Sequence, residues 1–200
     1  MKVTGVIQAG GKSTRMGGEP KALMELGGRR IIERVAAALH GAVDDLLIVT
    51  NTPELYGFLG LPMVPDVHPD RGSLGGIYSG LSAASGDAAF TVACDMPFLH
   101  RDVVRLVVER AARADVVIPR VGGQFETLHA SYAKSCLPPI KTALDAGRFK
   151  IVGWFDEVRV LEIDEAEVAR YADPGLVFMN VNTPDELALA RARVSEIANG

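Results

Sequence analysis

The feature that most constrains the fold is a regular alternation, up to Arg120, between short apolar segments and segments of helical spacing. The apolar segments have the length of buried strands, and they are residues 3–8, 46–50, 61–65, 88–94 and 115–119. The segments of helical spacing are residues 31–40, 75–85 and 101–112. Such alternation is typical of βαβ units, which form a parallel sheet with helices on both faces. It predicts an α/β protein with a three-layer, Rossmann-like sheet.

The pattern changes beyond Arg120. Residues 124–132 and 158–163 have the composition of strands, and residues 134–146 between them have that of a helix. We expect them to add an antiparallel extension to the sheet. Thr183-Pro184-Asp185-Glu186 is a capping box with proline at the first helical position, so it predicts a last helix that runs to about residue 198. No linker or repeat interrupts residues 1–200, which predicts a single domain.

A glycine-rich, cationic loop follows the first strand, from Ala9 to Lys21. It is neither a P-loop nor a dinucleotide-binding fingerprint, because its glycines do not have the required spacing. Gly10 and Gly11 still allow a tight turn whose N–H groups can face an anion, and the loop carries a net charge of +2. Ligands of parallel sheets bind outside the carboxyl ends of the strands. The loop therefore predicts a phosphate site; the alternative is a solvated turn.

The composition excludes several classes of function. The net charge is −4 and the pI about 5.6, so a nucleic-acid polymer is not an expected partner. The two cysteines, Cys94 and Cys136, cannot build a disulfide framework or a thiolate zinc site. We find no apolar run that reads as a signal peptide or a membrane span, and we expect a cytoplasmic protein.

Three motifs in consistent order resemble the molybdenum cofactor guanylyltransferases. They are Ala9-Gly10-Gly11 with Arg15-Met16-Gly17 and Lys21, then Cys94-Asp95-Met96-Pro97, then Asn180-Val181-Asn182-Thr183-Pro184. The resemblance implies the nucleotide-diphospho-sugar transferase variant of the Rossmann-like fold. Gln8 and Pro20 depart from that family, which usually has leucine and aspartate there. They leave open a cytidylyltransferase or a sugar-phosphate nucleotidyltransferase, and a non-catalytic GTP-binding module is a third alternative.

The resemblance implies transfer of GMP from GTP to molybdopterin with release of pyrophosphate. Asp95 would hold Mg²⁺, and Arg15 and Lys21 would be the other catalytic residues. The residues expected to bind the substrates are Gln8, Ala9, Gly10, Gly11, Lys21, Asn51, Asp66, Asp95, Asn180 and Asn182. The attacking phosphate of the pterin is mostly ionised near neutral pH, since its second pKa is roughly 6, so no general base is required. Proteins that deliver the pterin or receive the product are further expected partners.

Each candidate also has a structural alternative. Asp95 ends an otherwise uncharged strand, which suits a magnesium ligand, but it could instead cap the helix that begins near Leu99. Asp66 and Asn51 follow strands and could bind nucleotide or simply organise turns. Asn180 and Asn182 would share one face of an extended segment; the resemblance implies contact with the pterin, and the alternative is a pair of loop-organising side chains.

Other chemistries lack support in the sequence. His40, His68, His100 and His129 show no metal-binding spacing, and we expect them at the surface or in loops. Cys94 is expected to be a small core residue. No serine or cysteine can be placed in a triad, so hydrolase chemistry is not predicted.

Overall fold

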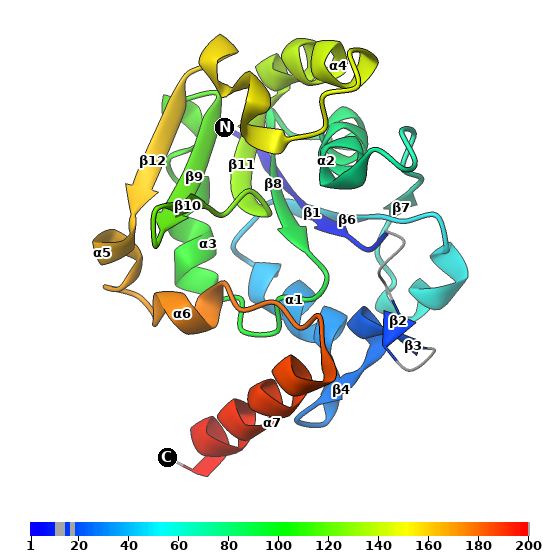
Figure 1. Cartoon of the computed structure of the whole chain (residues 1–200), viewed down its shortest axis with the longest axis vertical. Coiled ribbons are helices and arrows are strands. Elements are labelled where there is room, and N and C mark those ends of the chain that lie inside the picture. Colours follow the sequence, from blue (N-terminus) through cyan, green and yellow to red (C-terminus); the bar gives the residue numbers. More distant parts are fainter. Residues whose placement is uncertain (11–14, 17–18, 200) are drawn as a thin grey trace.

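The computed structural model describes residues 1–10, 15–16 and 19–199, with the backbone alone at 15–16, 19 and 197–199. A central sheet has the strand order β10-β9-β11-β8-β1-β6-β7, and β12 pairs with β9 off this path (Figure 1). Its strands are β1 (Val3–Gln8), β6 (Asp45–Val49), β7 (Met63–Val64), β8 (Ala88–Ala93), β9 (Val116–Val121), β10 (Gln124–Phe125), β11 (His129–Ala133) and β12 (Val160–Asp164). Two short hairpins lie outside it, β2 (Arg15–Met16) with β3 (Glu19–Pro20) and β4 (Glu25–Leu26) with β5 (Arg29–Arg30).

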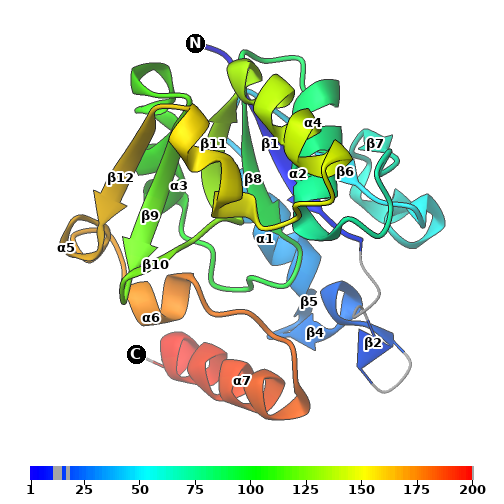
Figure 2. The same cartoon turned by 45° about the horizontal axis from the view of Figure 1, so that its top comes forward.

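Helices cover both faces of this sheet. The α-helices are α1 (Ile31–Leu39), α2 (Gly72–Ala83), α3 (Arg101–Val108), α4 (Leu137–Asp145), α5 (Glu165–Val168), α6 (Pro174–Val177) and α7 (Pro184–Asn199). Short 3-10 segments are η1 (Lys21–Leu23), η2 (Pro53–Leu55), η3 (Gly57–Leu59), η4 (Ala111–Arg113), η5 (Lys134–Cys136) and η6 (Ile151–Glu157). Helices α1 and α3 lie on one face, and α2 and α4 on the other (Figures 1 and 2). None of the helices in the described residues is long and apolar enough to cross a membrane.

The three layers follow from the alternation of side chains along each strand. Ile7 of β1 packs into the core beneath α1 and α3, whereas its neighbour Val6 packs into the core beneath α2 and α4. In β8, Phe90 packs into the core beneath α1 and α3, and its neighbour Ala89 packs into the core beneath α2 and α4. Because both faces bury apolar side chains, these strands are continuous apolar runs in the sequence, as a doubly covered parallel sheet requires.

The sheet is mostly parallel. Strand β1 pairs parallel with β6 and β8, and β6 pairs parallel with β7. Strand β11 is antiparallel to both β8 and β9, and β10 is antiparallel to β9. The α/β class, the covered parallel sheet and the presence of antiparallel strands are as the sequence predicts.

The region beyond Arg120 differs from the prediction in two respects. Residues 124–132 form two strands and not one, because a turn closed by the N–H of His129 on the carbonyl of Glu126 separates them. Strand β12 runs parallel to β9, so the extension is antiparallel only in β10 and β11. Strand direction depends on non-local pairing, which a pattern of apolar residues does not record.

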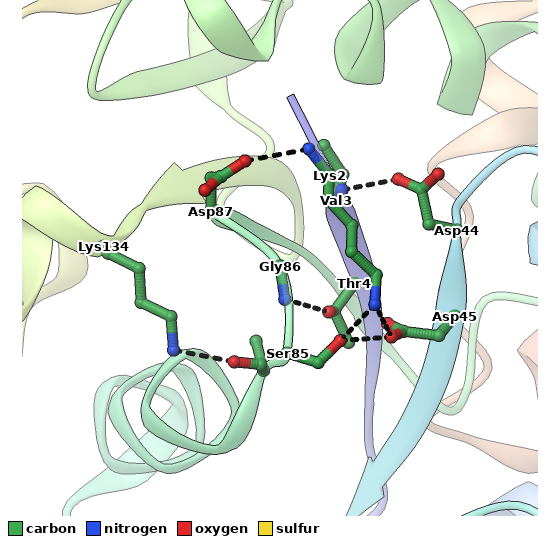
Figure 3. Close-up of polar contacts among 10 residues, drawn as sticks. Lys2, Val3, Thr4, Asp44, Asp45, Ser85, Gly86, Asp87 and Lys134 are labelled. Atoms are coloured by element: carbon green, nitrogen blue, oxygen red, sulfur yellow. Dashed lines mark hydrogen bonds and ion pairs between the residues drawn. The ribbon is translucent and has the colours of Figure 1, made fainter.

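A polar network fixes the amino end of β1, far from the strand ends that carry the predicted site. The backbone N–H of Lys2 donates to Asp87, and that of Val3 donates to the Asp44 carboxylate at 2.7 Å (Figure 3). The ammonium of Lys2 also pairs with Asp45 at 3.0 Å. These contacts hold β1 against the segments that precede β6 and β8, so the three strands begin in a fixed register.

The C-terminal helix α7 lies outside the three layers, at the end toward which β1 and β8 point (Figures 1 and 2). Its capping box forms as predicted, since the N–H of Glu186 donates to Thr183 Oγ1 and the Glu186 carboxylate accepts from the N–H of Thr183. Leu187 and Ala190 of α7 bury against Leu26 and Ile31 in a separate small core. The segment before α7 is thereby held across the carboxyl ends of the strands.

Candidate active site

Two adjoining pockets open at the carboxyl ends of β1, β6 and β8. The first, of about 460 Å³, lies at the start of α2, and we call it the α2 pocket. It is lined by Gln8, Gly10, Val49, Thr50, Asn51, Asp66, Pro69, Asp70, Gly72, Ser73 and Gly76. The second, of about 320 Å³, we call the Asp95 pocket. It is lined by Gln8, Gly10, Pro20, Lys21, Ala22, Tyr56, Ser73, Ala93, Cys94, Asp95, Leu128, Asn180 and Asn182. Gln8, Gly10 and Ser73 line both, so the two pockets form one cleft.

Asp95 enters its pocket directly after β8. The side chain is half-buried, and burial raises the pKa of its carboxyl group, while Lys21 opposes that rise. Asp95 does not cap α3, because the residue at that position is His100. The helix-cap alternative is therefore wrong, and Asp95 lines the same pocket as Lys21.

Lys21 is a buried lysine, with 8% of its surface exposed. It begins the short η1 turn, and its ammonium donates to Oδ1 of Asn182 at 3.0 Å. An ammonium is rarely buried unless it is paired, and this one has an amide oxygen beside it and the Asp95 charge in the same pocket. The arrangement keeps a positive charge fixed at the wall of the cleft.

Asn180 and Asn182 both line the Asp95 pocket, as their placement on one face of an extended segment predicts. They belong to residues 178–183, which connect α6 to α7 and which we call the strap. The N–H of Val181 donates to the carbonyl of Asp95 at 2.9 Å, and the Val181 side chain is fully buried. The strap is thus bound to the end of β8 and to Lys21.

Gln8 ends β1 and lies where the two pockets meet. Its Nε2 donates to the carbonyl of Ser73 at 3.3 Å, a long hydrogen bond. A Cβ on Gly76 would overlap the amide of Gln8, so only glycine at position 76 leaves room for this side chain beside α2. Gly10 has open space where a side chain would be, so its backbone is accessible to a ligand.

Asp66 and Asn51 line the α2 pocket and also organise its wall. Oδ1 of Asp66 accepts hydrogen bonds from Ser79 Oγ at 2.8 Å and from the N–H of His68 at 2.9 Å. The N–H of Asp66 in turn donates to Oδ1 of Asn51 at 2.9 Å. The turn-organising interpretation therefore describes what these groups do in the structure, and nucleotide binding by them stays a prediction.

Three predicted site residues are not seen in the cleft, either because the residue is buried elsewhere or because it falls outside the described part of the structure. Ala9 is 2% exposed and its N–H donates to the carbonyl of Val49, so that N–H is not available to a phosphate. Gly11 and the Arg15 side chain fall outside the described part of the structure, and their predicted roles stay untested.

His129 contradicts the expectation that the histidines lie at the surface or in loops. It is fully buried in β11, with its ring edge-on to those of Phe90 and Phe178. Burial lowers the pKa of its imidazole to about 3. The residue follows the turn that ends at Leu128, and a histidine flanked by apolar residues gives no sequence signal that separates a core position from a loop position.

Sequence reasoning also missed Tyr56 and Leu128, which line the Asp95 pocket. Tyr56 is 2% exposed, and burial, with a contribution from Cys94, raises the pKa of its hydroxyl group to about 12. Cys94 packs against the core as expected but also lines the pocket, and burial, reinforced by Asp95, raises the pKa of its thiol to about 12. No motif marks Tyr56, so only the fold reveals its place.

The described residues contain no group of three or more His, Cys, Asp or Glu side chains that could hold a metal by themselves. A single carboxylate suffices for an ion that takes its remaining ligands from phosphate and water, as Mg²⁺ does. Asp95 is half-buried, and among the described residues it is the one carboxylate that lines the Asp95 pocket, which suits that kind of ion. It could not by itself build a site for Ca²⁺ or for a structural zinc ion.

The three-layer fold is one that solved nucleotidyltransferases share. Solved structures that share it include molybdopterin-guanine dinucleotide biosynthesis protein A from Archaeoglobus fulgidus, with a TM-score of 0.82 over 96% of this chain and 99% of that one at 24% identity. Another is 4-diphosphocytidyl-2C-methyl-D-erythritol synthase from Anaerococcus prevotii, with a TM-score of 0.72 over 97% and 96% at 13% identity. At these identities the likeness is one of fold.

Sequence comparison identifies the family. Residues 5–160 match the MobA-like NTP transferase domain, and the chain belongs to that family. A probable molybdenum cofactor guanylyltransferase from Pelotomaculum thermopropionicum is 38% identical over 100% of this chain and 97% of its own length. A molybdenum cofactor guanylyltransferase from Desulfosudis oleivorans is 40% identical over 96% of each. The family resemblance drawn from the three motifs is thereby confirmed.

Proposed function

We propose that this nucleotidyltransferase transfers GMP from GTP to molybdopterin and releases pyrophosphate. The observation that carries the proposal is the cleft. Lys21 and Asp95 line one of its pockets, together with Asn180 and Asn182 of the strap, and the α2 pocket adjoins it. Relatives that match along nearly the whole chain are named for this activity. The cleft provides room for a nucleotide at one end and for a second substrate at the other.

The reaction is a displacement at phosphorus. An oxygen of the terminal phosphate of the pterin forms a bond to the α-phosphorus of GTP, and the bond from that phosphorus to the β-phosphate oxygen breaks. Pyrophosphate leaves with the electron pair. The attacking phosphate is already largely ionised, so positioning and charge neutralisation are what the protein must supply. No general base is needed, which agrees with a cleft whose lining, among the described residues, includes no histidine.

We assign the roles by position in the cleft. The nucleoside occupies the α2 pocket beside Gln8, Asn51 and Asp66, and the triphosphate passes over Gly10. Lys21, already desolvated, offsets the charge that develops on the departing pyrophosphate. Arg15 and the Gly11 amide are proposed for the same phosphates on sequence grounds alone.

We propose Mg²⁺ as the metal, held by Asp95. When bound, the ion supplies charge neutralisation at the phosphate oxygens. The strap fixes the backbone at Asp95, since the Asp95 carbonyl accepts the N–H of Val181. Asp95 and Lys21 would then present opposite charges across one pocket.

The test measures pyrophosphate release from GTP and from CTP in the presence of molybdopterin and Mg²⁺. We expect release from GTP, and we expect Lys21→Ala and Asp95→Ala each to lower kcat by about 10²- to 10³-fold with the fold intact by circular dichroism. The matched controls are Lys141→Ala and Asp102→Ala, which remove charges at the surface whose ion pairs, among the described residues, lie within their own helices. Both should leave kcat within about twofold of the wild-type value.

Each alternative has its own result. Release from CTP and not from GTP would indicate a cytidylyltransferase. Release with a sugar phosphate and not with molybdopterin would indicate a sugar-nucleotide enzyme. Tight GTP binding without turnover on any acceptor would indicate a binding module. Near-wild-type rates in Lys21→Ala or Asp95→Ala would overturn the assigned roles.

Three further predictions accompany this proposal and stay predictions. They are a single domain over residues 1–200, a cytoplasmic location, and protein partners that deliver the pterin or receive the product.

A further inference from the structure

Glu186 lies at the start of α7 and contacts the strap through one carboxylate oxygen. Its Oε2 accepts hydrogen bonds from the N–H of Asn182 at 2.6 Å and from the N–H of Thr183 at 2.9 Å. Thr183 Oγ1 accepts the N–H of Glu186 at 3.2 Å in return. A capping box needs only one bond in each direction, so the bond to Asn182 is an additional contact.

The segment that Glu186 holds reaches both proposed catalytic residues. The side chain of Asn182 accepts a hydrogen bond from the Lys21 ammonium at 3.0 Å. Its neighbour Val181 donates its N–H to the Asp95 carbonyl at 2.9 Å and buries its side chain beneath α7. One short segment, fixed at one end by Glu186, is therefore hydrogen-bonded to the Lys21 ammonium and to the backbone of Asp95.

A lysine side chain has four rotatable bonds, so holding its ammonium at one position costs rotamer entropy. Among the described residues, the Asn182 amide is the polar side chain that holds the Lys21 ammonium in a single direction. If the backbone at Asn182 turns, Oδ1 of Asn182 moves away, and the Lys21 ammonium loses the hydrogen bond that orients it. Preorganised charge is what such a reaction needs, and misplacement by about 1 Å can cost 10²-fold in rate.

We propose that Glu186 is a positioning residue for the transfer reaction, because it fixes the backbone of Asn182 so that the Asn182 amide directs Lys21. Asn182 then acts on the lysine, in place of the pterin contact that the sequence resemblance implies for it. The catalytic consequence rests on the proposed function; the structural part, that Glu186 holds the strap, does not.

The chain offers a control that separates this role from helix capping. Thr183→Ala removes the hydroxyl that caps α7 but leaves the Glu186 carboxylate free to accept from residues 182 and 183. Glu186→Ala removes the contact with Asn182 as well as its half of the cap. Glu186→Gln keeps an oxygen acceptor and serves as the conservative rescue. Glu196→Ala, further along α7 and paired with Arg193 of the same helix, controls for loss of a helix charge.

The experiment measures kcat and KM for GTP, the melting temperature, and hydrogen exchange of the peptide that spans residues 178–183. For Glu186→Ala we expect kcat to fall about tenfold with KM within about twofold, and faster exchange at Val181 and Asn182. For Thr183→Ala we expect a similar loss of melting temperature, with kcat and strap exchange near the wild-type values. Glu186→Gln should recover most of kcat, and Asn182→Ala combined with Glu186→Ala should be no slower than the slower single variant.

The outcomes separate the inference from the proposed function. Equal losses of kcat in Glu186→Ala and Thr183→Ala would show that Glu186 only caps the helix. Unchanged exchange of the strap in Glu186→Ala would overturn the inference whatever the activity. A wild-type protein that releases no pyrophosphate, with faster strap exchange in Glu186→Ala, would overturn the proposed function and leave the structural part of the inference supported.

Discussion

His129 is compatible with its surroundings in only one protonation state. Both ring nitrogens are buried and have no hydrogen-bond partner among the residues that the structure describes, and the ring contacts Phe90 and Phe178. An imidazolium there would be an unpaired buried charge, which is why burial lowers the pKa to about 3 from the ordinary 6.5. Phe178 begins the strap, so this residue also lies beneath the segment that reaches Lys21 and Asp95.

The first prediction concerns the pH dependence of stability. Between pH 6.5 and 3 the unfolded chain binds a proton at His129 and the folded chain does not, so stability falls as the pH falls. From pH 7 to pH 5 the loss should be about 2 kcal/mol. His129→Leu should remove that part of the loss in urea unfolding, whereas His40→Leu, at an exposed position, should not. Identical pH profiles for wild type and His129→Leu would contradict the assignment.

Single residues also show what the sequence can predict about the site. Lys21, Asp95, Asn180 and Asn182 were identified from motifs, and the fold brings all of them to one pocket. Tyr56 was not, because it lies in a loop without a motif and reaches the cleft only through folding. The Lys21–Asn182 hydrogen bond joins residues 161 positions apart, and no local pattern encodes such a contact.

Helix α2 shows how one element serves both the core and the cleft. Gly80 packs against β1, where an added Cβ would overlap Val6 and come within 3.1 Å of Val49. Gly76, one turn earlier, faces the end of β1, where an added Cβ would meet only the tip of Gln8. The same substitution should therefore have different consequences at the two positions.

The second prediction uses this pair. Gly80→Ala should lower the free energy of unfolding by about 1 kcal/mol or more, because overpacking of a rigid core costs more than helix propensity returns. Gly76→Ala should keep or raise stability but displace Gln8, and loss of one neutral hydrogen bond to the ligand would raise KM for GTP about 3- to 10-fold. Urea unfolding and steady-state kinetics on both variants test this. A raised KM in Gly80→Ala with unchanged stability would contradict the assignment of Gly80 to the core and Gly76 to the cleft.

The helices and strands that the sequence predicts well are those whose sequence signals lie within a few neighbouring residues. The apolar strands β1 and β8 and the capping box of α7 depend on neighbouring residues, and each was found within a few positions of its observed bounds. The β4–β5 hairpin, with two residues in each strand, is too short for a periodic signal. The direction of β12 depends on its pairing with β9, whose partner residues lie 44 positions away.

At the scale of the whole molecule, the cleft is assembled from three distant parts of the chain. Lys21 comes from the first loop, Asp95 from the end of β8, and Asn182 from the segment before α7. A ligand that contacts all three should stabilise the folded state as a unit, because none of these contacts exists in the unfolded chain. The increase in stability that a ligand produces therefore reports binding in the cleft and does not require turnover.

The last prediction follows from this linkage. GTP at about 100 times its Kd should add about 2.7 kcal/mol, which corresponds to about 5–10 °C in melting temperature for a protein of this size. Mg²⁺ should be required for the full shift, because Asp95 lines the same pocket as Lys21 and is the proposed ligand through which the ion would reach the phosphates. Asp95→Asn should lose the part that depends on Mg²⁺, while Asp102→Asn should retain it. Equal shifts by GTP and CTP would show that Gln8 and the α2 pocket do not select the base, and an undiminished Mg²⁺ effect in Asp95→Asn would place the ion elsewhere.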